Sequence, residues 1–339
     1  MRPALTEPGA RIADFLAGAG WGDAQTRPLA ADASFRRYHR VRRNGCSAML
    51  MDAPPAREDV RPFVRVARHL HGLGLSAPAI LAADEAQGLL LLEDFGDDTF
   101  TRLLAAGCDE EDLYRLAVDV LIHLHRLPAA EALPAGLPAY DLPRLQDEAL
   151  LLPDWYMPAV LDRPTDAGLR DSYAAAWEQA LRPVLAQPAT LVLRDFHVDN
   201  LMRLPSRDGL AACGLLDFQD AVAGPAAYDL MSLLEDARRD VSAEVRRAML
   251  QRYRESTGGA DDDGFLAAFA VLAAQRHAKV IGIFTRLCRR DGKAIYLGHI
   301  PRVWRLLERA LEHPALAPVA DWFERHLPAS ARRVPAAEG

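Results

Sequence analysis

Apolar and polar residues follow different patterns in the two parts of this chain. Up to Leu92, short runs of apolar residues are typical of strands, and one longer amphipathic stretch is typical of a helix. Beyond Phe95, the apolar residues recur with the helical period. The pattern predicts strands near residues 35–41, 47–51 and 89–92, helices near 12–18 and 60–73, and later helices near 103–124, 173–185, 245–253, 265–284 and 303–311.

The change of pattern falls at Glu93-Asp94-Phe95-Gly96, where a strand of leucines meets a polar turn. We therefore expect an α+β fold, with a small β-rich domain in residues 1–95 and a larger, mostly helical domain in residues 96–327. Residues 328–339 are expected to form a loose tail.

One segment of the helical part carries candidate chemistry. Asp195 and Asn200 stand in the run Leu193-Arg194-Asp195-Phe196-His197-Val198-Asp199-Asn200, with the spacing D-x-x-x-x-N, and Asp217 follows in Leu216-Asp217-Phe218. In kinase catalytic loops, such an Asp orients the acceptor hydroxyl, and the Asn holds a magnesium ion. A second carboxylate such as Asp217 would complete the metal site, so the combination predicts a phosphotransferase.

The same residue types have a structural interpretation. Asp and Asn are common in turns and helix caps, so a D-x-x-x-x-N spacing alone would more often be structural. Asp217 favours the catalytic interpretation because it follows a predicted strand of its own, residues 214–216. His197, inside the segment, is interpreted as structural rather than as a proton-transfer group.

Composition and charge remove several other classes of protein. A chain of 339 residues with 50% hydrophobic content can bury a large core in about two domains. The net charge of -7 argues against a nucleic-acid-binding protein, and four cysteines without a C-x-x-C pair indicate neither a zinc site nor a disulfide framework. Because no apolar run approaches the roughly 20 residues that span a bilayer and no secretory signal is visible, we expect a cytoplasmic protein without a membrane anchor. The oligomeric state stays open, with a monomer favoured.

The catalytic segment resembles that of the aminoglycoside phosphotransferase and choline kinase superfamily of small-molecule kinases. It lacks the leading histidine of protein kinases, and Leu216-Asp217-Phe218-Gln219-Asp220 and Tyr228-Asp229-Leu230 follow it. The resemblance covers essentially the whole chain, and it extends to one branch, the anomeric kinases of cell-wall sugar recycling. The segments similar to that branch are Asp32-Ala33-Ser34-Phe35-Arg36-Arg37-Tyr38, Leu50-Met51-Asp52-Ala53-Pro54-Pro55, Leu92-Glu93-Asp94-Phe95-Gly96-Asp97, Asp154-Trp155-Tyr156, Gln275-Arg276-His277 and Arg289-Arg290-Asp291-Gly292-Lys293.

The resemblance implies a two-lobed, protein-kinase-like fold with a nucleotide-binding N-lobe and an acceptor-binding C-lobe. It implies that ATP and Mg²⁺ are used to phosphorylate the anomeric hydroxyl of N-acetylmuramate and N-acetylglucosamine. The α-1-phosphate product would then pass to a uridylyltransferase. Carried onto this sequence, Asp195 becomes the catalytic base or orienting group, Asn200 and Asp217 the magnesium ligands, and Asp229 a brace for the catalytic loop. The preferred sugar and the nucleotide donor stay open.

The chain departs from the kinase pattern in its phosphate-binding residues. Its only lysines are Lys279 and Lys293, so the N-lobe lacks the lysine that pairs with the nucleotide phosphates, and no glycine-rich phosphate loop is present. Arg36 and Arg37 are the candidate replacements, with a solvated arginine face as the alternative. Because alternate side chains of a strand face opposite ways, we expect Arg36 to face the site.

Other nucleotide contacts are expected from a turn and from the junction between the two lobes. The turn Asp32-Ala33-Ser34-Phe35 would meet the phosphates through backbone N–H groups and the Ser34 hydroxyl. Adenine is expected against backbone groups between Glu93 and Phe95. The Phe95 ring is equally consistent with a core anchor.

The acceptor site is expected to combine polar and aromatic side chains. Candidates of the right type are Glu148, Trp155, Tyr156, Asp199 and Gln219. A lactyl carboxylate on muramate would attract an arginine, for which Arg276, Arg286 and Arg290 are the candidates. The alternative for each arginine is an ordinary surface charge on an amphipathic helix.

Two other functional classes stay open. The first is another small-molecule kinase of the same fold, acting on an aminoglycoside, choline or homoserine; an antibiotic-modifying enzyme would show an acidic pocket for its polycation. The second is a catalytically silent nucleotide-binding module, which the absent lysine would fit. The presence of Asp195, Asn200 and Asp217 together argues against the silent module.

Overall fold

The computed structural model describes residues 8–29, 35–258 and 262–336. The chain divides into two compact units, and each unit is built from two separate stretches of sequence. The sheet unit comprises Met1–Asp109 and Val198–Asp220, and the helical unit comprises Glu110–His197 and Ala221–Gly339. Asp195 therefore belongs to the helical unit, whereas Asn200 and Asp217 belong to the sheet unit.

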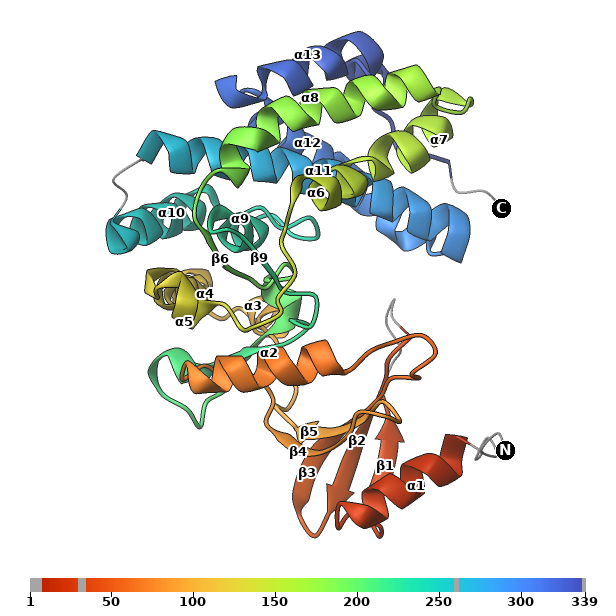
Figure 1. Ribbon diagram of the computed structural model, residues 1–339, viewed down its shortest axis with the longest axis vertical. Coiled ribbons are helices and arrows are strands. Elements are labelled where there is room, and N and C mark those ends of the chain that lie inside the picture. The colour runs from red at the N-terminus through yellow and green to blue at the C-terminus, as the bar shows by residue number, and fades with distance from the viewer. Residues whose placement is uncertain (1–7, 30–34, 259–261, 337–339) are drawn as a thin grey trace. The chain divides into compact units, whose positions relative to one another are not determined.

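A five-stranded antiparallel sheet forms the centre of the sheet unit (Figure 1). Its strand order is β1-β2-β3-β5-β4, in which β3 pairs with both β2 and β5. The bounds are β1 Gln25–Pro28, β2 Arg37–Arg43, β3 Cys46–Asp52, β4 Ile80–Asp84 and β5 Leu89–Glu93. The strands predicted from the sequence correspond to β2, β3 and β5. The two edge strands were not predicted, because β1 is exposed along its whole length and β4 buries no residue fully.

The core of the sheet unit lies on both faces of β5. Leu89 and Leu91 pack with Val41 and Leu50 and with Leu16 of α1 (Pro8–Gly18). The residues between them, Leu90 and Leu92, are also buried, and they face the opposite way because side chains alternate along a strand. A four-leucine run is what a strand buried on both faces requires. The rest of this unit comprises α2 Arg61–Gly72, α3 Phe100–Ala105, η2 Val198–Asn200, β7 Leu201–Arg203, η3 Gly209–Ala212 and β8 Cys213–Leu215.

The helical unit is organised around α11, a helix of 30 residues, Asp262–Asp291. Of the described helices, α11 alone is long and apolar enough to cross a membrane, but 78% of its most apolar window is buried inside the protein. It contacts α6, α8, α9 and α12 and the π-helical turn η1, which explains its apolar composition without a membrane (Figure 1). The other elements are α4 Glu110–Arg126, α5 Ala129–Ala132, α6 Leu142–Ala149, η1 Leu152–Tyr156, α7 Met157–Leu161, α8 Ala167–Leu185, α9 Ala227–Leu234, α10 Ala243–Thr257, η4 Ala294–His299, α12 Ile300–Leu311, η5 Pro314–Leu316, α13 Ala317–His326 and η6 Ala329–Ala331.

Residues after Leu327 make specific contacts with the helical unit. The Arg332 guanidinium lies 2.7 Å from the Glu308 carboxylate, and the carbonyl oxygen of Arg333 accepts a hydrogen bond of 2.7 Å from the Tyr156 hydroxyl. These contacts tie the last described turn of the chain to α12 and η1.

A short two-stranded ladder lies beside these helices. Strand β6 (Ala189–Val192) pairs antiparallel with β9 (Val222–Pro225), and α9 begins two residues after β9. The ladder fixes the loop that follows β6, which carries Asp195, next to the first turn of α9, which carries Asp229.

The approach of η1 to α11 requires a residue without a side chain. An added Cβ at Gly282 would lie 2.3 Å from the Leu151 carbonyl carbon, closer than real carbon atoms approach. The obstacle is backbone, which cannot rotate away as a side chain can. Gly282 is therefore interpreted as a packing residue rather than as a flexible point in α11.

We expect Gly282→Ala to lower the free energy of unfolding by about 1–3 kcal/mol, because the added methyl group overpacks a close contact. Gly298→Ala is the matched control in the same unit, since an added Cβ there meets no atom within 4 Å. Urea unfolding of the two variants measures the difference. Equal stability of the two variants would contradict the inferred contact.

Candidate active site

Asp229 holds the backbone of the loop that follows β6. Its carboxylate accepts hydrogen bonds from the N–H groups of Leu193, at 2.6 Å, and Arg194, at 2.9 Å. The side chain is fully buried, and burial raises the pKa of Asp229 to about 7, whereas the two backbone donors favour its ionised form. Two consecutive N–H groups are thus oriented by one carboxylate.

Two residues of the candidate site have left-handed backbone conformations. Arg194, immediately before Asp195, has φ 70°, and Asp217 has φ 55°. Neither is glycine, so each conformation costs about 1–3 kcal/mol, which the surrounding structure must offset. Strain of this kind collects at functional sites, and here it occurs beside one predicted catalytic residue and at one predicted metal ligand.

Asp195 lies near a buried guanidinium in the helical unit. Arg276 of α11 places Nη2 3.9 Å from Asp195 Oδ1, while its Nη1 donates to the Tyr228 hydroxyl at 3.2 Å. Burial alone would raise the pKa of Asp195, but Arg276 and Lys279 outweigh it and hold the pKa below its usual value. The Asp195 side chain is 40% exposed and is therefore an ionised, accessible hydrogen-bond acceptor at neutral pH.

Glu148 of α6 joins three elements of the helical unit through a buried charge cluster. It forms ion pairs with Arg194 and with Lys279 of α11, whose Nζ lies 2.9 Å from Oε1. Its other oxygen accepts hydrogen bonds from the Tyr140 hydroxyl at 2.5 Å and from Gln275 Nε2 at 3.3 Å. Burial tends to raise the pKa of Glu148, but the two cations and Tyr140 keep it below its usual value. Glu148 is thus an ionised anchor for the residue that precedes Asp195.

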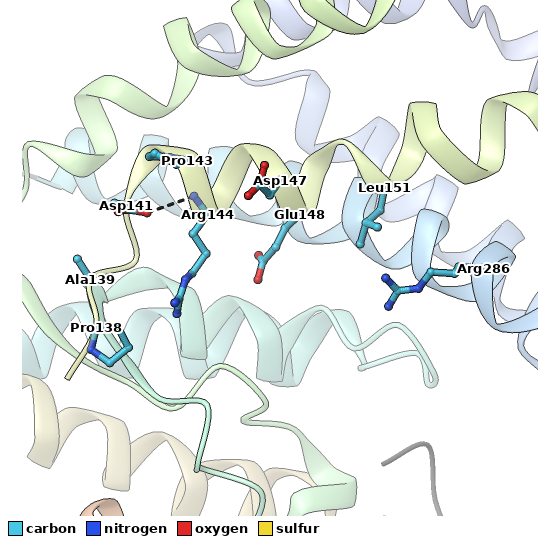
Figure 2. Close-up of a pocket in the computed structure, with 9 residues that line it drawn as sticks. All are labelled: Pro138, Ala139, Asp141, Pro143, Arg144, Asp147, Glu148, Leu151 and Arg286. Carbon is cyan, nitrogen blue, oxygen red and sulfur yellow. Dashed lines mark hydrogen bonds between the residues drawn. The ribbon is translucent and has the colours of Figure 1, made fainter. Parts of the chain in front are cut away.

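The same carboxylate lies at a cavity of about 520 Å³ in the helical unit. Figure 2 shows Arg144 and Glu148 projecting from one face of α6, with Arg286 of α11 turned toward them. A volume of this size is in the range of small-molecule sites, roughly 300–1,000 Å³. The remaining lining residues are Pro138, Ala139, Asp141, Pro143, Asp147 and Leu151.

Asn200 and Asp217 lie at matching ends of two paired strands in the sheet unit. Strands β7 and β8 pair with Leu201 opposite Leu215, and the Asn200 carbonyl accepts the Leu216 N–H at 3.0 Å. Asp217 is the next residue along, so the register brings an amide oxygen and a carboxylate to one edge. Such hard oxygen donors fit Mg²⁺, which takes few protein ligands and completes its shell with water and phosphate oxygens. No cluster of three His, Cys, Asp or Glu ligands occurs in the described part of the chain.

Neighbouring side chains fix the position of Asp217. Phe218 is buried and stacks on Phe63 of α2 with ring centroids 4.8 Å apart. Gln219 Nε2 donates to Asp217 Oδ1 at 2.8 Å, which helps to position the carboxylate. The contacts explain why a residue with strained backbone is held in one place.

Arg36 contacts the candidate metal ligand within the sheet unit. Its Nη1 lies 3.3 Å from Asp217 Oδ1 and its Nε lies 3.4 Å from Glu58 Oε2. The Arg36 side chain is 12% exposed, whereas Arg37, the first residue of β2, is exposed. Phe35 is 56% exposed and lies under the Arg57 guanidinium, and Ser34 lies outside the described residues.

The residues expected near adenine are already engaged in part. The Glu93 N–H donates to the Ala79 carbonyl, so it is not free for a base. The Glu93 carboxylate pairs with Arg207, whose guanidinium also lies over the Phe95 ring at 5.4 Å. An added Cβ at Gly214 would lie 2.9 Å from that ring, so Phe95 packs against β8.

Several acceptor candidates lie in other surroundings. Tyr156 is fully buried, and its hydroxyl bonds to the Arg333 carbonyl and to Trp304 Nε1. Asp199 accepts a hydrogen bond from the Thr101 hydroxyl in the sheet unit. Arg290 is exposed and pairs with Asp291, and Trp155 is half-buried in η1. None of these four lines the cavity of Figure 2.

Sequence reasoning missed several residues that lie beside candidate residues within one unit or the other. Arg144, Arg194, Tyr140 and Lys279 belong to the cavity or to the Glu148 cluster, and Glu58 pairs with Arg36. Lys279 offered the one available signal, because a lysine in an apolar stretch of a chain with two lysines needs a buried partner.

Comparison with known proteins identifies the family. The sequence model of the phosphotransferase enzyme family matches residues 25–269. The chain belongs to this family. It is 38% identical to an N-acetylmuramate/N-acetylglucosamine kinase of Caulobacter vibrioides, over 97% of this chain and 99% of that protein. A protein of the same name from Pseudomonas aeruginosa is 39% identical over 91% of this chain and 92% of that protein.

A solved structure supports the fold. A choline/ethanolamine kinase family protein from Mesorhizobium loti superposes with a TM-score of 0.60 at 16% identity, covering 92% of this chain and 98% of that one. The predicted α+β, protein-kinase-like fold and the predicted superfamily are therefore confirmed. Family membership also confirms the prediction of an ATP-dependent phosphotransferase.

We expect Arg36→Ala to raise the KM for ATP by about 10- to 100-fold, because the variant loses one charge-assisted contact with the nucleotide phosphates. Arg37→Ala is the matched control, since an exposed arginine contributes little and its KM should stay within about twofold. Arg36→Lys should recover part of the loss, because it restores the charge without the forked geometry. Steady-state kinetics with varied ATP separate the three variants, and equal effects of Arg36→Ala and Arg37→Ala would contradict the assignment.

Proposed function

We propose that this protein is an ATP-dependent kinase that phosphorylates the anomeric hydroxyl of N-acetylmuramate and N-acetylglucosamine. The observation that carries the proposal is a cavity of about 520 Å³ lined by Glu148, which pairs with Arg194, the residue before Asp195. Two relatives with identities of 38% and 39% carry the name of this activity. The cavity lining combines the guanidinium groups of Arg144 and Arg286 with the carboxylates of Asp141, Asp147 and Glu148, so it offers both donors and acceptors to a polar sugar.

Asp195 is the group that we assign to the acceptor hydroxyl. As an ionised carboxylate it accepts the hydrogen bond of that hydroxyl and directs the oxygen lone pair at the γ-phosphorus. The bond from the sugar oxygen to phosphorus forms while the bond to the β-phosphate oxygen breaks. The hydroxyl proton passes to Asp195 and ADP leaves. Arg276 holds the carboxylate ionised before this step.

Asn200 and Asp217 are the residues that we assign to Mg²⁺, and Arg36 is assigned to the nucleotide phosphates. The bound ion would neutralise charge on the phosphates. Arg36 pairs with Asp217 in the present structure, so nucleotide and metal would take over contacts that the two side chains now make with each other. Adenine would lie beside the β5 end near Phe95.

A place in metabolism follows from the product. A sugar α-1-phosphate is the substrate type that a uridylyltransferase activates, so we propose a cytoplasmic role in cell-wall sugar recycling before such an enzyme. The protein is proposed to act as a monomer on a small-molecule acceptor.

We expect phosphorus NMR of the protein with Mg·ATP and N-acetylmuramate to show a new sugar-1-phosphate resonance coupled to the anomeric proton. N-Acetylglucosamine should give the same type of signal, because both sugars carry the free anomeric hydroxyl. Kanamycin in a parallel tube is the control for the antibiotic-modifying alternative. Phosphorylated kanamycin without a sugar phosphate would refute the proposed function.

We expect Asp195→Asn to lower kcat by about 10²- to 10⁴-fold, the contribution of a positioned general base. ATP binding, measured by calorimetry, should be nearly unchanged because Asp195 is assigned to the acceptor. Asp154→Asn is the control, since Asp154 is an exposed carboxylate that pairs with Arg170. A fully active Asp195→Asn variant would remove the assignment.

A further inference from the structure

Two arginines at the cavity have no partner for their guanidinium groups among the described residues. Arg144 donates its backbone N–H to Asp141, but its side chain makes no hydrogen bond or ion pair with any described residue. Arg286 is half-buried, and its Nε is buried without a hydrogen-bond partner in the part of the chain that the structure describes. Burial, followed by the nearby Arg290, lowers the pKa of Arg286.

The other arginines around this part of the helical unit are paired. Arg194 pairs with Glu148, Arg276 with Asp195 and Tyr228, and Arg170 with Asp154. An arginine left unpaired beside a cavity is costly, because a buried donor without an acceptor loses its hydration. Arg286 Nε is such a donor, and an anion from outside the chain would supply the acceptor that it lacks.

The carboxylates of the cavity cannot supply this partner. Asp141 caps α6 by accepting the Arg144 N–H, and Glu148 is already shared by Arg194 and Lys279. Asp147 is exposed and follows Arg144 by three positions on α6, yet no ion pair joins the two side chains among the described residues. No carboxylate that lines the cavity thus forms an ion pair with Arg144 or Arg286 in the part of the chain that the structure describes.

We infer that Arg144 and Arg286 bind the lactyl carboxylate of N-acetylmuramate and thereby determine the preference between the two sugars. This inference rests on the proposed function. The sugars differ in the lactyl ether at C3, which carries the only ionised group of N-acetylmuramate. Figure 2 shows the Arg144 guanidinium from α6 and the Arg286 guanidinium from α11 on either side of Glu148, and each alone offers the forked pair of donors that a carboxylate accepts.

The position of the cavity fits this role. Glu148, which lines it, pairs with the residue before Asp195, and Lys279 acts on both Glu148 and Asp195. A sugar whose anomeric hydroxyl meets Asp195 could thus extend its C3 substituent toward the side of the cavity where Arg144 and Arg286 lie. Glu148, held ionised in the cavity lining, would accept hydrogen bonds from uncharged sugar hydroxyl groups.

The test compares two substrates in the same variants. We expect Arg286→Ala and Arg144→Ala each to raise the KM for N-acetylmuramate about 10- to 100-fold, the effect of losing one charge-assisted hydrogen bond. The KM for N-acetylglucosamine and both kcat values should stay within about twofold, because that sugar has no group for the arginines to bind. Arg286→Lys should recover part of the N-acetylmuramate affinity.

Arg290→Ala is the matched control, because Arg290 lies one turn further along α11 but is exposed and paired with Asp291. It should leave both KM values unchanged. The carboxamide of N-acetylmuramate supplies a control on the ligand side. With the unmodified protein it should bind as weakly as N-acetylmuramate binds to Arg286→Ala. Thermal unfolding checks that each variant is folded.

The outcomes separate the two proposals. An equal loss with both sugars would make the arginines structural and overturn the inference, as would unchanged kinetics in the Arg144→Ala, Arg286→Ala double variant. In either case phosphorylation of the sugars by the unmodified protein would leave the proposed function standing. If the unmodified protein phosphorylates neither sugar, the proposed function fails first, and the specificity inference falls with it.

Discussion

The buried carboxylate of Glu148 is the interaction on which the helical unit's site depends. It connects α6, the loop after β6 and α11 through Arg194 and Lys279, with hydrogen bonds from Tyr140 and Gln275. A buried ion pair contributes little net stability relative to an apolar core, but loss of one partner costs about 3–5 kcal/mol. The cluster therefore determines how α6, the loop after β6 and α11 are arranged, and contributes less to the stability of the fold. It fixes Arg194 in a left-handed conformation while Asp229 holds the same backbone from the other side.

A chain with two lysines distributes its positive charge mainly through arginine. Arginine suits this role because its guanidinium stays charged when buried and can satisfy two or more acceptors at once. Arg276 shows the benefit, since it contacts the Arg194 carbonyl, the Tyr228 hydroxyl and the Asp195 carboxylate together. Lys279, by contrast, directs its single ammonium group at one carboxylate oxygen of Glu148.

The sequence was sufficient for the features that depend on local pattern. The leucines of β5, the amphipathic helix α2 and the long apolar run of α11 follow from periodicity. Spacing beside predicted strands identified Asp195, Asn200 and Asp217 as candidates, and their roles stay predictions. Edge strand β1 could not be predicted, because an exposed strand has no alternating apolar face. The partners of Glu148 could not be predicted either, since Arg194 and Lys279 are 46 and 131 positions away along the chain. Long-range charge pairs leave no periodic signal. Residue type alone is no better guide, since Tyr156, assigned by type to an acceptor role, lies in a core contact with Trp304.

The glycine at position 282 has a consequence beyond packing. Leu151, whose carbonyl it accommodates, also lines the cavity, and Arg286 is one helical turn further along α11. The spacing of the cavity walls therefore depends on Gly282, a residue without a functional group. Relatives, natural or engineered, with a larger residue at this position would need a wider separation between η1 and α11. Their substrate range would then change although the residues that touch the substrate stay the same.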